Sequence, residues 1–91
     1  MYVVGKIWCH NTPYETMKKK EYDNYENAKA AYDMAIKNER YKVHMYGYKR
    51  SERFFMRNPK EESTVFTDDN IYIDGNDYNF CEVFLYECKN S

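Results

Sequence analysis

The segment that decides the fold is residues 23–39, which read DNYENAKAAYDMAIKNE. Asp23 can accept a hydrogen bond from the first turn of a helix, and Glu26 follows three residues later, in a capping-box arrangement. Apolar side chains then recur at helical spacing and form one stripe: Tyr25, Ala28, Tyr32, Ala35 and Ile36. The pattern predicts a helix over about residues 24–39, whose alanines let it approach a sheet closely.

Two strands are predicted before this helix. Residues 2–9 are rich in β-branched and aromatic types, as strands are. Residues 15–22 return as a polar strand, with a plain loop as the alternative. The lysines of this second segment suit the edge of a sheet, where charge discourages unwanted pairing.

More strands are predicted after the helix. Residues 41–48 alternate in character, and residues 52–57 return after a turn. Residues 58–64 are polar and predict a loop, whereas residues 65–73 hold a short strand or two before a hairpin turn at 74–77. The last strand, residues 78–88, is largely apolar on both faces, which indicates a central position with cover on both sides.

These elements predict a single α+β domain over residues 1–91, with an antiparallel sheet of five or six strands and one helix on one face. One helix cannot cover two faces. The second face is therefore expected to be a wet platform for a ligand or to pack against another copy of the chain. The chain has one Leu but 11 Tyr and 5 Phe, so aromatic rings must supply much of the packing, whether AT-rich codon usage or function explains them.

Charge is distributed unevenly along the chain. Residues 1–36 carry five basic and five acidic side chains, residues 37–60 carry eight basic and two acidic ones, and residues 61–91 carry one basic and eight acidic ones. The segments therefore sum to 0, +6 and −7 within a net charge of −1. Such asymmetry favours a charged partner, unless the two charged segments pair with each other inside the protein.

The motifs of enzymes and cofactor sites are missing from the sequence. The three glycines, Gly5, Gly47 and Gly75, are isolated, so no phosphate-binding loop is predicted. The cysteines and histidines lack the paired spacing of a zinc site, and buried structural thiols are the better interpretation. We expect no catalysis, no metal and no cofactor. No signal peptide or membrane segment is visible, and the odd cysteine count fits a reducing, cytoplasmic location.

Basic and aromatic side chains interleave over residues 41–57, which are interpreted as a hairpin. Phosphates need charge and bases need rings, so this pattern is typical of a nucleotide or nucleic-acid platform, although a protein partner fits it as well. The alternative is that these basic groups pair with Glu82, Glu87 or the aspartates of neighbouring strands. The candidate binding residues are Lys42, His44, Tyr46, Tyr48, Arg50, Arg53 and Arg57.

The functional expectation is a small non-catalytic binding protein that occupies a partner protein or a second copy of itself, most simply as a dimer. Short chains of such composition are common among accessory proteins of phages and mobile elements that inhibit host or defence factors. The alternative is a protein that binds or sequesters a nucleotide or a nucleic acid through residues 41–57. No contact with a membrane is expected.

Overall fold

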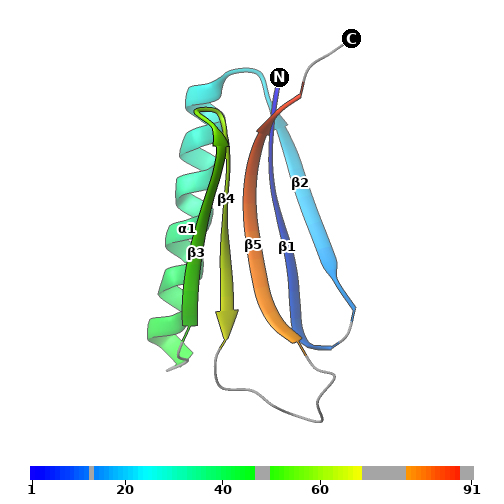
Figure 1. The fold of residues 1–91 in the computed structure, drawn as a ribbon, viewed down its shortest axis with the longest axis vertical. Helices are drawn as coiled ribbons and strands as arrows, with labels where there is room; N and C mark the ends of the chain where they lie inside the picture. The colour runs from blue at the N-terminus through cyan, green and yellow to red at the C-terminus, as the bar shows by residue number, and fades with distance from the viewer. Residues whose placement is uncertain (13, 47–49, 69–77, 89–91) are drawn as a thin grey trace.

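The computed structural model describes residues 1–12, 14–46, 50–68 and 78–88. Along them lie β1 (Tyr2–Thr12), β2 (Thr16–Tyr22), α1 (Tyr25–Tyr46), β3 (Arg50–Asn58), β4 (Glu61–Asp68) and β5 (Tyr78–Glu87). The strands form one antiparallel sheet in the order β2-β1-β5-β4-β3, with α1 against one face (Figure 1). The predicted class, an α+β domain with an antiparallel sheet of five or six strands and one helix, is confirmed, with five strands among the described residues.

The core lies between α1 and one face of the sheet. Ala28, Tyr32 and Ile36 of the helix are buried, and Tyr25 and Ala35 pack at the margin, so the predicted stripe is confirmed. The strands contribute alternate residues to this core: Tyr2, Val4, Phe66, Cys81, Val83 and Leu85. The intervening side chains of the strands point the other way, because successive residues of a strand face opposite sides. We call that side, which α1 does not cover, the open face.

The helix begins one residue later than the capping pattern predicts. The Oδ1 atom of Asn24 accepts a 2.9 Å hydrogen bond from the N–H of Asn27, and Tyr25 is the first helical residue. Asn24 is therefore the N-cap, and the assignment of that role to Asp23 is wrong. Glu26 still lies in the first turn, where its negative charge favours the positive end of the helix dipole.

The helix also ends much later than predicted. It continues to Tyr46, so the predicted strand over residues 41–48 is wrong. Two ion pairs to the sheet anchor the last turns: Glu39 with Lys6 of β1, and Arg40 with Glu52 of β3 at 2.9 Å. Residues 41–46 have side chains that suit a strand, and the tertiary contacts of the preceding turn override that local preference.

The strand predictions are confirmed in most places. Residues 2–9 lie in β1, the predicted strand 15–22 is β2 from Thr16 onward, and the lysine-rich β2 is an edge strand. Residues 78–87 form β5, which occupies the centre of the sheet. Residues 69–77, including the predicted hairpin turn, lie outside the described residues.

The predicted loop over residues 58–64 is confined to a turn at residues 59–60, because β3 ends at Asn58 and β4 begins at Glu61. The loop prediction is wrong for the other residues of this range. The polar residues Glu62 and Thr64 of β4 face the helix, where Lys29 and the Tyr32 hydroxyl bind them. Polarity there reflects hydrogen bonding in the interior and does not mark a solvated turn. Among the residues that the structure describes, no helix is long and apolar enough to span a membrane.

Candidate functional site

The predicted binding residues do not form one hairpin. Lys42, His44 and Tyr46 belong to the last turns of α1, whereas Arg50, Arg53 and Arg57 belong to β3, and Tyr48 lies outside the described residues. The alternating basic and aromatic strand that motivated a nucleotide or nucleic-acid platform is therefore not present as such. That these residues bind a partner stays a prediction, and the two arginines with described side chains, Arg53 and Arg57, carry it forward.

The charge pairing proposed as the alternative is also not observed for these arginines. Among the described residues, neither Arg53 nor Arg57 forms an ion pair, whereas Lys42 lies 3.0 Å from a carboxylate oxygen of Glu39. Both arginines are exposed and lie on the edge strand β3. Their guanidinium groups are accordingly available to a carboxylate or another planar acceptor of a partner.

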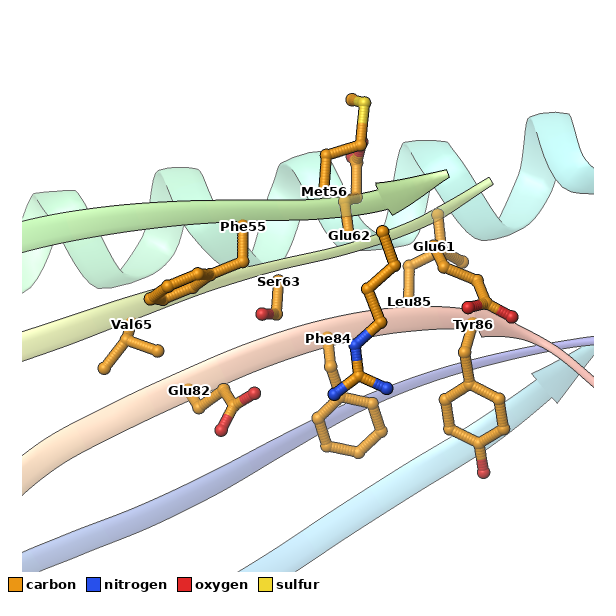
Figure 2. Close-up of a pocket in the computed structure, with 11 residues that line it drawn as sticks. Phe55, Met56, Glu61, Glu62, Ser63, Val65, Glu82, Phe84, Leu85 and Tyr86 are labelled. Carbon is orange, nitrogen blue, oxygen red and sulfur yellow. The ribbon is translucent and has the colours of Figure 1, made fainter. Parts of the chain in front are cut away.

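A groove of about 520 Å³ runs over strands β3, β4 and β5 (Figure 2). Phe55, Val65, Glu82, Phe84 and Tyr86 project into it from the same side of the strands, while Met56 points to the opposite side. The remaining lining comes from side chains and backbone of neighbouring positions: Arg57, Glu61, Glu62, Ser63 and Leu85. The groove therefore lies on the open face and combines apolar rings with charges of both signs.

One aromatic side chain of the groove, Phe84, lies against a glycine of the neighbouring strand β1. A Cβ atom added at Gly5 would lie 2.2 Å from Cζ of Phe84, so the ring lies directly over the β1 backbone. The Phe84 ring also stacks on the Tyr86 ring, with centroids 5.9 Å apart and an interplanar angle of 19°. The contact with the β1 backbone and the stacking hold both rings in place. This part of the groove is therefore formed before any partner binds.

The electrostatics of the groove favour a mixed partner over a polyanion. Arg57 lines the groove together with Glu61 and Glu82. Two carboxylates beside one guanidinium work against the accumulation of phosphates that nucleic-acid binding requires. A peptide segment with an apolar residue and a charged residue suits this lining better.

The edge strand β3 adjoins the groove and exposes three consecutive apolar side chains. Phe54, Phe55 and Met56 are 57%, 49% and 56% exposed. Phe55 belongs to the groove on the open face, and Phe54 and Met56 stand on the opposite side of the same strand. Sequence reasoning did not identify these three residues as exposed, because their exposure depends on the position of β3 at the edge of the sheet.

Buried charges between α1 and the sheet have a structural role. Glu62 pairs with Lys29, and the Tyr32 hydroxyl lies 2.7 Å from Oγ1 of Thr64. Burial raises the pKa of Tyr32, with the Thr64 hydrogen bond acting in the opposite direction. Burial lowers the pKa of Lys29, but its bonds to Glu62 and Asp33 outweigh this effect and raise the pKa overall. These groups fix the helix on the sheet, and the sequence pattern did not reveal them.

Cys9 has the environment of a structural thiol. It is buried, and its Sγ donates a 3.3 Å hydrogen bond to the carbonyl oxygen of Tyr14. Burial, with a smaller contribution from Glu15, raises its pKa, which is the opposite of what a nucleophilic thiolate needs. In the described part of the chain, no three His, Cys, Asp or Glu side chains are grouped as metal ligands would be.

Comparisons of this chain with protein-family models, with curated proteins and with solved structures found no match. The groove and the neighbouring edge strand are therefore the basis for an interpretation of function.

Proposed function

We propose that this protein is a small non-catalytic binding module that recognises a segment of a partner protein in the groove over β3, β4 and β5. The observation that carries the proposal is the groove itself, with its stacked aromatic pair and an arginine that forms no ion pair among the described residues. Phe84 and Tyr86 supply rigid apolar area at little cost in side-chain entropy, as the anchors of protein interfaces do.

Arg57 supplies specificity in this proposal. A guanidinium binds a carboxylate or a backbone carbonyl of the partner in a defined geometry, whereas Glu82, which also lines the groove, would bind a lysine or an N–H group. Binding alone is sufficient for activity of this kind. An accessory inhibitor from a phage or mobile element, which blocks a host factor by occupying its surface, would work in this way.

The test compares groove variants with matched variants elsewhere on the surface. Phe55→Glu places a charge in the groove, and Met34→Glu makes the same change on the helix, where Met34 is 55% exposed. Arg57→Glu and Lys37→Glu form a second pair, in which both residues are exposed and both charges are reversed. Each variant is first shown to be folded by circular dichroism and is then used for affinity capture from the native host, with quantitative mass spectrometry.

We expect the proteins captured by the unmodified chain to be retained by Met34→Glu and Lys37→Glu. The same proteins should be depleted at least tenfold with Phe55→Glu and with Arg57→Glu, because a desolvated contact that is lost at an interface weakens binding by about this much or more. Equal capture by all four folded variants would show that the groove is not the binding site.

A further inference from the structure

The two edges of the sheet are built differently. The β2 edge carries Lys18, Lys19 and Lys20 in succession, all exposed. Lysines at an edge keep other strands away, because pairing would desolvate and crowd their charges. The β3 edge has no such run, and at its middle it exposes Phe54, Phe55 and Met56 instead. One edge is thus protected from strand pairing, while the other presents open backbone groups beside exposed apolar side chains.

We propose that β3 pairs antiparallel with β3 of a second copy of this chain, about a two-fold axis at Phe54, so that the two sheets become one continuous sheet. The partner is a copy of the same strand because β3 is complementary to itself in one register and repels itself in the neighbouring ones. This inference does not depend on the proposed groove function, since it concerns purified protein alone.

The register follows from the two faces of the sheet. A two-fold axis perpendicular to the sheet keeps both helices on the same side, so residues that face each other must belong to the same face. The axis can then pass through a residue but not between two residues. The candidates near the middle of the strand are Arg53, Phe54 and Phe55.

Charge decides among these three positions. With the axis at Arg53, the two copies of Arg53 face each other directly, and with the axis at Phe55, Arg53 faces Arg57 of the second copy twice. Like charges at directly opposite positions destabilise a strand pair. With the axis at Phe54, Arg53 faces Phe55 of the second copy, and Glu52 faces Met56 of the second copy. No like charges are then opposed between positions 52 and 56.

The register centred on Phe54 also uses the strand most fully. β3 spans Arg50–Asn58, nine residues, and Phe54 is its middle residue. The contacts in the centre are favourable, since the two copies of Phe54 cover each other on one face and Arg53 reaches over the Phe55 ring on the other. The β-bulge between Met56 and Asn58 bends the strand at one end, so the pairing relies mainly on positions 52–56.

A cysteine scan tests both the partner and the register. In antiparallel pairs, directly opposite Cα atoms are about 4.5–5.5 Å apart, within the range that a disulfide spans. Residues displaced by two positions are about 7–8 Å apart and bridge poorly. Phe54→Cys should therefore form a disulfide with its copy, whereas Phe55→Cys should not. Both changes are made in a Cys88→Ser background, because Cys9 and Cys81 are buried and Cys88 is partly exposed.

The expected result, under mild oxidation at micromolar concentration, is a covalent dimer of Phe54→Cys that forms at least tenfold faster than that of Phe55→Cys. Light scattering of the unmodified chain should give a dimer mass that falls towards the monomer mass on dilution. Phe54→Glu, which opposes two carboxylates at the axis, should raise the dissociation constant at least tenfold, and Met34→Glu should not change it.

Three results would overturn the proposal. Faster crosslinking of Phe55→Cys would mean a different register, and equal rates for both variants would mean random collision. A monomer mass for the unmodified chain over a hundredfold range of concentration would exclude the dimer and leave the β3 edge for a strand of another protein. Unchanged host-protein capture by the groove variants, together with an intact dimer, would refute the groove proposal alone, so the two proposals fail separately.

Discussion

Replacement of Gly5 by alanine should destabilise the domain through a single ring. The new Cβ would lie 2.2 Å and 2.7 Å from Cζ and Cε2 of Phe84, and 2.9 Å from the backbone oxygen of Lys18. Because non-bonded carbon atoms do not approach so closely, the Phe84 ring must move away from its position on the β1 backbone. Overpacking of this kind costs about 1–3 kcal/mol. Loss of the stacked contact with Tyr86 adds about 0.5–1.5 kcal/mol.

One effect acts in the opposite direction. Alanine stabilises a strand interior by about 0.5–1 kcal/mol relative to glycine, because an alanine loses less backbone conformational freedom on folding than a glycine does. The steric cost exceeds this gain, so Gly5→Ala should lower the free energy of unfolding by about 1–3 kcal/mol. The whole free energy of unfolding of a domain of 91 residues is roughly 5–14 kcal/mol, so a change of this size is readily measured.

The assay is urea unfolding of four proteins in a double-mutant cycle: the unmodified chain, Gly5→Ala, Phe84→Ala and the double variant. Without the Phe84 ring, the two closest contacts of the added methyl group are removed, and the 2.9 Å approach to the backbone oxygen of Lys18 remains. The cost of Gly5→Ala should therefore be at least about 1 kcal/mol smaller in the Phe84→Ala background, a coupling of ordinary size for residues in contact. An equal cost in both backgrounds would refute the position of the ring over Gly5.

Further predictions concern the contact between α1 and the sheet. Ala28 is 0% exposed, so Ala28→Asp should lower the free energy of unfolding by about 3–5 kcal/mol, because it buries an unpaired charge. The control Ala30→Asp, on the exposed side of the helix, should lower it by less than about 1 kcal/mol. Equal melting temperatures of the two variants would contradict this prediction. Because burial raises the pKa of Tyr32, the folded state binds more protons than the unfolded chain once the pH exceeds 10.0, and the free energy of unfolding should fall as the pH rises further. In Tyr32→Phe, the part of this fall in the free energy of unfolding that comes from Tyr32 should be absent. At neutral pH the variant should be less stable by about 1 kcal/mol, because the Thr64 hydroxyl loses its hydrogen-bond partner. Urea unfolding at several pH values measures both effects.

The sequence predicted those elements whose pattern reflects burial on one side. The stripe of Ala28, Tyr32 and Ile36 predicted the packed face of the helix, and the apolar faces of residues 78–88 predicted the central strand. The lysines of residues 15–22 predicted an edge. In each case solvent or the core selects the residue types directly, so local composition is informative.

The errors arose where a distant partner decides the environment. Glu62 and Thr64 look like loop residues until the opposing Lys29 and Tyr32 are known. The residue types of 41–46 are compatible with a strand. The preceding helical turn forms ion pairs with β1 and β3, and the local sequence does not reveal these contacts. Because the candidate site residues were assigned on that strand, the groove was not predicted. Only a correct order of strands places Phe55 and Phe84 on either side of Ser63 in one groove.

The order of the strands has a consequence for how the protein folds. The two central neighbours, β1 and β5, come from opposite ends of the described chain (Figure 1). The N–H of Cys88 donates a 2.8 Å hydrogen bond to the carbonyl oxygen of Met1. During synthesis, β1 can therefore pair only with β2 until β5 has left the ribosome. Because this pairing closes a very long loop, formation of the sheet should be slow and cooperative, with no stable half. Before that step Tyr2, Val4 and the helix stripe have no β5 to cover them, and the unfinished chain is at its most prone to aggregation.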